Sequence, residues 1–257
     1  MTQTVSKTSR GDREAFQMSP RRKTALVAGV LYLLTFVSIP TLSLYNQVKG
    51  ANYILGPGPD TAVIVGSILE IIVALACIGT AVALLPVLKR QNEGVALGFV
   101  GSRVLEAATI FAGVVFLLSV VSLRQAGVGA AGLVTAQTLI IMYNRTFLVG
   151  QSLMPAVNAL LLGSLLYQSR LVPRVLPLLG FTGAVLLVAS DIGVLFNLWG
   201  QTSSVAVLAA LPIALWEFSL GVYLVVKGFK TPEAVKENAK TGGRSMGTPP
   251  DDVNDWN

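Results

Sequence analysis

The stretch from Thr61 to Leu85 reads TAVIVGSILEIIVALACIGTAVALL, and Glu70 is its one charged side chain. A bilayer core of about 30 Å requires about 20 mostly apolar helical residues, so this stretch is long enough to span it. Five other stretches meet the same requirement: Thr24–Leu44, Val95–Leu123, Thr146–Tyr167, Val175–Trp199 and Val205–Val226. The sequence therefore predicts an all-α, polytopic membrane protein, built as a bundle of six transmembrane helices.

The composition of the chain agrees with a membrane protein and excludes several kinds of chemistry. Of its 257 residues, 53% are hydrophobic and 12% are charged, about half the charged fraction of a typical soluble domain. The chain has no histidine and a single cysteine, Cys77, which excludes imidazole catalysis, histidine–metal sites, intrachain disulfides and cysteine-cluster metal sites. We therefore expect no cofactor, no metal site and no catalytic residue, and an enzyme is the least favoured function.

The positions of the basic residues predict the topology. Eleven lysines and arginines lie before the first span or after the last one, and four more lie in the second and fourth connections. The first and third connections hold three: Lys49, Arg124 and Arg145. Because basic flanking residues collect on the cytoplasmic side of a membrane, this asymmetry places both termini in the cytoplasm. A nucleic-acid-binding protein would gather its basic residues on one soluble face, so we expect no nucleic-acid partner.

Two polar segments flank the apolar part of the chain. Residues 1–20 lack a hydrophobic period and predict a disordered cytoplasmic arm. Residues 231–257 contain paired glycines, paired prolines and an acidic end, and they predict a disordered cytoplasmic tail. Residues 21–230 between them are expected to form one six-helix transmembrane domain with short cytoplasmic turns.

Two of the connections carry local signals of their own. Gly56–Pro59 reads GPGP and predicts a turn, after which Asp60 or Thr61 can cap the amide groups that open the next span. The connection Arg124–Arg145 is rich in glycine and alanine and also contains an apolar run. It predicts either a helix on the outer surface or an extension of the fourth span.

Five ionisable side chains fall inside the predicted spans: Glu70, Arg103, Glu106, Asp191 and Glu217. Counting 1.5 Å per residue from the predicted boundaries puts Glu70 about 14 Å below the outer surface and Glu106 about 17 Å above the inner one. Glu217 and Arg103 fall in the same middle layer. Asp191 lies near the outer end of its span, where we expect it to snorkel or cap at the interface.

The neighbours of the three glutamates predict that these side chains point into the bundle. Each glutamate shares its helix face with glycine, alanine or other small residues, and helices approach one another in lipid through such faces. Asparagine and tyrosine side chains of two further spans reach the same depth. The sequence therefore predicts a polar, partly charged pocket at mid-membrane, with these candidate ligand-binding residues: Tyr32, Glu70, Arg103, Glu106, Asn158 and Glu217.

Two functions fit such a pocket. In the first, the protein binds a small molecule, a cation or a proton, as a transporter or sensor does; Glu70 and Glu217 are then the cation or proton ligands, Arg103 is the fixed counter-charge and Glu106 its partner. In the second, the protein is a non-catalytic accessory membrane protein, and the buried charges only fix helix packing. The lipid bilayer is the one expected partner in both cases, and the sequence indicates no oligomeric state.

Several segments of the chain resemble a known family. They are Gly79–Gly94 (GTAVALLPVLKRQNEG), Arg103–Glu106 (RVLE), Asn158–Gly163 (NALLLG), Ser169–Arg174 (SRLVPR) and Pro212–Glu217 (PIALWE). Together and in this order they resemble the bacterial integral-membrane family called domain of unknown function 4386. The resemblance runs from about Arg21 to Lys230. It implies a prokaryotic, multi-pass protein of the inner (cytoplasmic) membrane, and it implies no activity and no site residues.

Overall fold

The computed structural model describes residues 18–50 and 52–230, and within these ranges it is all-helical, without a strand. Six helical segments are long and apolar enough to cross a membrane: Pro20–Leu44, Thr61–Leu88, Glu93–Gln125, Gly129–Ser169, Val175–Leu195 and Ser204–Val226. The predicted fold class is thus confirmed. The arm and tail predicted for the two ends of the chain lie almost entirely outside the described residues.

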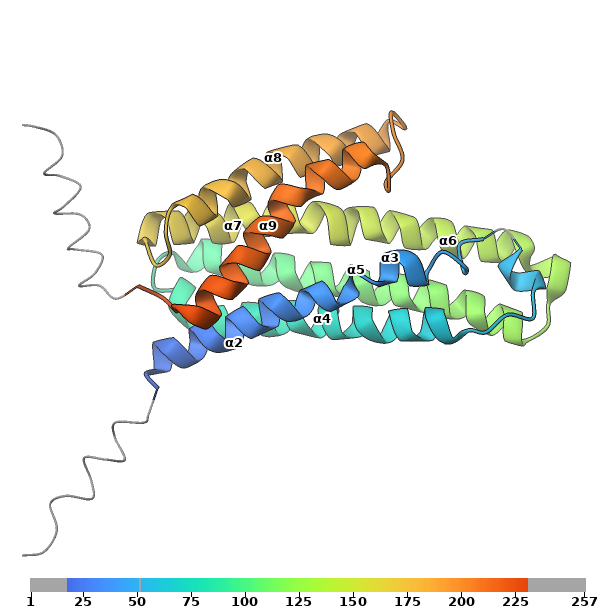
Figure 1. Ribbon diagram of the computed structural model, residues 1–257, viewed down its shortest axis with the longest axis horizontal. Coiled ribbons are helices and arrows are strands. Elements are labelled where there is room, and N and C mark those ends of the chain that lie inside the picture. The colour runs from blue at the N-terminus through green and yellow to red at the C-terminus, as the bar shows by residue number, and fades with distance from the viewer. Residues whose placement is uncertain (1–17, 51, 231–257) are drawn as a thin grey trace, which may run out of the picture.

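The six segments are built from these elements. The α-helices are α2 (Pro20–Leu34), α3 (Thr41–Leu44), α4 (Thr61–Leu88), α5 (Glu93–Gln125), α6 (Leu133–Phe147), α7 (Met154–Ser169), α8 (Val175–Leu195) and α9 (Ser204–Val226). The short 3-10 helices are η1 (Thr35–Ser38), η2 (Tyr53–Leu55) and η3 (Gly129–Gly132), and η4 (Leu148–Leu153) is a π-helix. Figure 1 shows how they are arranged.

The first span is interrupted in its second half. Pro40 has no backbone N–H and its ring would clash with the carbonyl four residues earlier, so a regular α-helix cannot run through it. The α-helix ends at Leu34 and is followed by the tighter 3-10 helix η1, and a new α-helix, α3, begins at Thr41. The Thr35 hydroxyl donates to the Tyr32 carbonyl at 2.7 Å, which also accepts from the Thr35 backbone N–H.

The fourth span is continuous from η3 through α6, η4 and α7, so the predicted extension of this span is confirmed. Its π-helical turn has a local cause. Pro155 cannot donate to the carbonyl of Gln151, and the wider turn of η4 accommodates the missing hydrogen bond. Gln151 and Ser152 lie in this turn, at a depth where other spans surround them.

The start of α2 and the end of α9 lie at the same end of the bundle, on the left of Figure 1. We call this the terminal end and the opposite one the distal end. The Arg22 side chain fastens the two chain ends, because its guanidinium donates to the carbonyls of Leu224 at 2.9 Å and Val225 at 2.5 Å. The turns α4–α5 and α7–α8 lie at the terminal end too, and the α5–α6 connection lies at the distal end.

The closest helix contacts within the bundle are made at small residues. Gly29 on α2 lies against the backbone of α9 at Gly221, and Gly183 on α8 lies against the backbone of Ile213. Large apolar side chains such as Val82 and Val185 point outwards and are more than 60% exposed. This distribution is typical of a membrane protein, in which lipid covers the large apolar side chains and small residues let the helices approach.

Asp60 holds the distal ends of α4 and α5 together instead of capping α4. It occupies the cap position, but its side chain makes no cap hydrogen bond, so that prediction is wrong. Its carboxylate accepts from the Tyr53 hydroxyl at 2.5 Å and from Gln125 Nε2 at 3.0 Å, and it pairs with Arg124. Burial acts to raise the pKa of Asp60, but these hydrogen bonds and the Arg124 charge outweigh it and hold the pKa below its usual value.

We expect Asp60→Asn to lower the free energy of unfolding by about 1–3 kcal/mol, because it weakens hydrogen bonds to a charged acceptor. Since the folded-state pKa is depressed, this stabilisation is present above the unfolded-state pKa of about 3.9 and is lost as the pH falls through the folded-state value. The measurement is thermal unfolding in detergent between pH 3 and neutral pH. Glu93→Gln, which changes an acid without an ion pair in the described chain, should cost at most about 0.5 kcal/mol.

Candidate functional site

Arg103 on α5 is the centre of a buried group of polar side chains. Only 1% of its surface is exposed. Its Nη1 donates to Glu106 Oε2 at 2.9 Å, and its Nη2 lies 3.5 Å from Glu217 Oε1 on α9. The guanidinium carbon lies 4.9 Å from the centre of the Tyr32 ring on α2. One guanidinium therefore connects three helices and faces two carboxylates.

Asn158 on α7 completes this group. Its Nδ2 donates to Glu106 Oε2 at 2.7 Å, so that one carboxylate oxygen accepts from both Arg103 and Asn158. The Ser102 hydroxyl in turn bonds to Asn158 Oδ1. We call Tyr32, Arg103, Glu106, Asn158 and Glu217 the Arg103 cluster. The structure thus brings together five of the six residues that the sequence predicts for a pocket.

Glu70 is the sixth predicted residue, and it lies in a separate group. Its Oε1 accepts from the Tyr143 hydroxyl at 3.0 Å and from Gln151 Nε2 at 3.3 Å. Cys77, which is seven residues further along α4, is the residue that meets Arg103, at 3.5 Å. Glu70 is therefore about 10 Å nearer the distal end than that contact. The expectation that all three glutamates meet Arg103 at one depth needs this correction.

The length of α4 explains the discrepancy. The expected depth of Glu70 was counted from Thr61 as a marker of the outer surface, but a 28-residue helix is about 42 Å long, which exceeds a bilayer core of about 30 Å. The first residue of α4 therefore does not mark the edge of the hydrocarbon. Asn144, Gln151 and Asn158 recur every seven residues and indicated a polar face of the fourth span, but not that Gln151 contacts Glu70.

Asp191 on α8 is also buried, with 6% of its surface exposed. The expectation that it snorkels or caps at the interface is wrong, because the Ser152 hydroxyl of η4 donates to its Oδ1 at 2.6 Å. Its Oδ2 accepts no hydrogen bond from the described part of the chain. No lysine or arginine of that part forms an ion pair with it. Asp191 is therefore a buried carboxylate without a basic partner among the described residues.

A cavity of about 660 Å³ lies between the broken first span, η4, α8 and α9. Its charged lining residues within the described chain are Glu106, Asp191 and Glu217, and all three are acidic. Nine uncharged polar residues also line it: Thr35, Ser38, Thr41, Asn46, Gln151, Ser152, Ser190, Gln201 and Thr202. Glu217 Oε1 faces Arg103 Nη2, whereas Asp191 Oδ2 is buried and accepts no hydrogen bond from the described residues. Asp191 is thus the carboxylate of the cavity lining that is left without a cation in the described chain.

A family model for a domain of unknown function (DUF4386) matches residues 27–228, which is most of the chain. The chain belongs to the DUF4386 family. No curated protein and no solved structure matches it. The residues matched by the DUF4386 model include the whole Arg103 cluster, Glu70 and Asp191, so the acidic cavity is part of the family domain.

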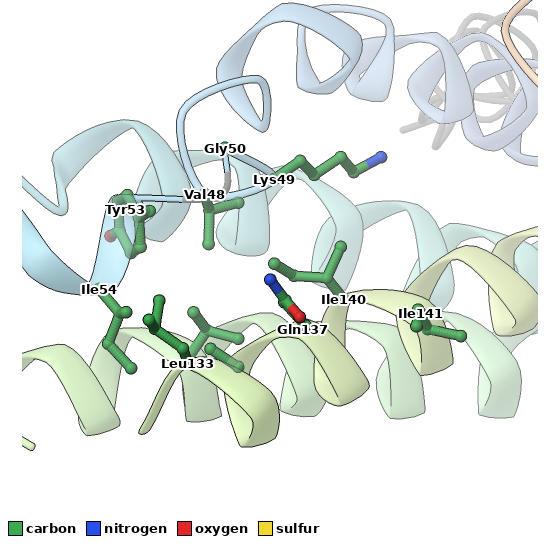
Figure 2. A pocket seen from close by; sticks show the side chains of 11 residues that line it. Val48, Lys49, Gly50, Tyr53, Ile54, Leu133, Gln137, Ile140 and Ile141 are labelled. Atoms are coloured by element: carbon green, nitrogen blue, oxygen red, sulfur yellow. The ribbon is translucent and has the colours of Figure 1, made fainter. Parts of the chain in front are cut away.

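A second, smaller cavity of the DUF4386 domain, of about 260 Å³, lies at the distal end. Figure 2 shows Val48, Ile54, Leu133 and Ile140 around it, with Lys49 extending away from Tyr53. The Lys49 ammonium lies 4.6 Å from the centre of the Tyr143 ring. The hydroxyl of Tyr143 in turn donates to Glu70. Burial lowers the pKa of Lys49, although the Glu70 charge acts in the opposite direction. Unlike the larger cavity, this one has no acidic lining residue in the described chain.

Proposed function

We propose that this DUF4386 protein binds a small organic cation in its acidic cavity and acts as a transporter or sensor in a bacterial inner membrane. One observation carries the proposal: the charged residues known to line the cavity are three carboxylates, and Asp191 among them has no basic partner in the described chain. A buried carboxylate without a partner is costly, so a bound cation stabilises it. Intramembrane acids of this kind mark ligand or ion sites.

The size and lining of the cavity favour an organic cation over a bare inorganic ion. Sites for small molecules have volumes of about 300–1,000 Å³, and this cavity of about 660 Å³ falls in that range. Phe36 and Phe147 also line it, and aromatic rings attract ammonium groups. A protonated amine can donate N–H hydrogen bonds to the Asp191 carboxylate and to the uncharged polar residues beside it. Of the Arg103 cluster, Glu106 and Glu217 line the cavity.

The structure also supports the membrane orientation. Among the described basic residues, Lys49 and Arg124 lie in distal connections, and Arg145, which was expected in the third connection, lies within α6. A larger group lies at the terminal end: Arg21, Arg22, Lys23, Lys89, Arg90, Arg170, Arg174, Lys227 and Lys230. We infer that the terminal end faces the cytoplasm, since basic residues collect there. The outer part of the cavity, lined by Asn46, Gln201 and Thr202, then faces the periplasmic side.

A purely structural function is the second candidate, because Glu106 of the Arg103 cluster already has hydrogen-bond partners within the protein. Glu106 accepts hydrogen bonds from both Arg103 and Asn158, and this network ties α5 to α7 and needs no ligand. If Asp191 and Glu217 had the same function, their replacement would change stability alone. The two candidates therefore differ in whether the neutral variants lose a ligand.

We expect Asp191→Asn to weaken the binding of protonated amines about 10-fold or more in the purified full-length protein. Glu217→Gln should cause a smaller loss, since the Arg103 charge already compensates Glu217. The measurement is isothermal titration calorimetry, after a thermal-shift screen of simple primary, secondary and quaternary amines. Glu93→Gln at the start of α5 is the control. Unchanged amine affinity in Asp191→Asn, or no amine that stabilises the parent protein, would contradict the proposal.

A further inference from the structure

The lateral opening of the acidic cavity carries one more inference. Two apolar residues of the first span, Ile39 and Leu42, and two of α9, Val207 and Leu211, line the cavity. All four are between 47% and 61% exposed. Exposed apolar side chains on membrane-spanning helices face lipid. The cavity therefore has an apolar flank that opens sideways between the first span and α9, and we call these four residues the apolar flank.

Asp191 lies close to this flank. Helices α8 and α9 are antiparallel neighbours, and Gly183 of α8 lies against Ile213 of α9. Asp191 is eight residues further along α8 and is thus level with the first turn of α9, residues 204–207. The Asp191 carboxylate is therefore at the height of the lipid-facing opening.

A polar edge borders the same opening on its distal side. Asn46 follows α3, and Gln201 and Thr202 lie in the turn between α8 and α9; all three line the cavity. The opening therefore combines a polar edge, a buried negative charge and an apolar flank. An amphipathic ligand at a membrane interface matches these features, because its charged head lies next to water and its apolar chain lies in the hydrocarbon.

We propose that the ligand is an amphipathic amine that enters from the distal leaflet of the bilayer. Its ammonium group binds the Asp191 carboxylate, and its hydrocarbon chain lies along the apolar flank. This inference rests on the proposed function, because it requires that the cavity binds a cation, and it adds the class of cation and the route of entry. A compact hydrophilic cation would leave the apolar flank without a partner and gain nothing from it.

The first test is a chain-length series of butylamine, hexylamine and octylamine with the full-length protein in lipid nanodiscs. Burial of each added methylene group against the flank raises affinity about threefold to fourfold when affinity is expressed against the free aqueous amine concentration. Asp191→Asn measured in parallel gives the nonspecific partitioning of each amine into the lipid. The expected result is a rise of that size in the part of the binding that depends on Asp191.

The second test blocks the opening. Leu42→Trp and Val207→Trp place a large ring in the apolar flank from opposite sides, and each should weaken octylamine binding about 10-fold while methylamine binding changes little. Val185→Trp is the matched control, because Val185 is an exposed valine of α8 that does not line the cavity. Two blocking variants are used so that poor folding of one leaves a measurement.

The outcomes separate the two proposals. If butylamine and octylamine bind equally well and both need Asp191, the amphipathic ligand is overturned and the cation site stands. The amphipathic ligand is likewise overturned if both blocking variants bind octylamine as the control does. If no amine in the series depends on Asp191, the proposed function itself fails. A chain-length dependence that disappears in both blocking variants supports the lateral route.

Discussion

Arg103→Ala should lower the free energy of unfolding by about 3–5 kcal/mol, the largest loss that we expect from any single substitution in the described chain. Removal of the guanidinium leaves Glu106 and Glu217 buried without their cation, and the cost of an uncompensated buried charge is of that size. The side chain is also 1% exposed, so its loss leaves a void among four helices. Reversible unfolding in mixed micelles measures the change.

Two further variants show whether charge or packing is responsible. Glu106→Gln in the Arg103→Ala background removes one uncompensated charge and keeps an acceptor for Asn158, so it should recover part of the lost stability. Arg90→Ala, in the exposed turn between α4 and α5, should change stability by less than about 0.5 kcal/mol. If Arg103→Ala is as stable as Arg90→Ala, the cluster does not stabilise the bundle.

Gly29→Ala should cost about 2–3 kcal/mol, because the added methyl group has no space. An ideal Cβ at this position would lie 2.7 Å from the carbonyl oxygen of Gly221 and 2.9 Å from the backbone nitrogen of Val225. Both atoms belong to the backbone of α9, which cannot rotate away as a side chain does. Helices α2 and α9 would have to separate, and overpacking of this kind destabilises by about 1–3 kcal/mol or more.

Gly101→Ala is the matched control, with an effect of the opposite sign. Gly101 lies in α5 and an added Cβ would meet nothing within 4 Å. Alanine has the better helix propensity, so this variant should gain up to about 1 kcal/mol. Thermal unfolding of both variants in the same detergent measures the difference. Equal effects for the two glycines would contradict the close contact between α2 and α9.

Hydropathy predicted the six spans of this protein, and the positions of small residues predicted which glutamates point into the bundle. A span needs about 20 apolar residues, and that requirement is local, so the six spans could be recognised one at a time. Glu70, Glu106 and Glu217 could be assigned to the interior because each shares a helix face with small residues. The extension of the fourth span was one of two alternatives left open by the composition of its first half.

Other features depended on contacts between helices that are far apart in the sequence, and no single segment predicts such contacts. The partners of Glu70 come from α6 and η4, and their depth follows from a continuous fourth span of 41 residues with a π-helical turn. Asp60 occupies a cap position by sequence, but Tyr53, Gln125 and Arg124 use its carboxylate. The cavity lies at the break in the first span, whose residues line it together with residues of α9.

The sequence by itself determined how many times the chain can cross a membrane and that Glu70, Glu106 and Glu217 are turned inwards. Both properties follow from the free energy of transferring side chains between water and lipid, which applies to each helix separately. The spacing of Arg103 and Glu106 on one helix also predicted that they pair. Only the tertiary structure decided that Glu217 faces Arg103 as well, while Asp191 is buried without a cation beside it among the described residues. The reason is that charge compensation in a medium of low dielectric depends on the distance between two groups, and helix packing sets that distance.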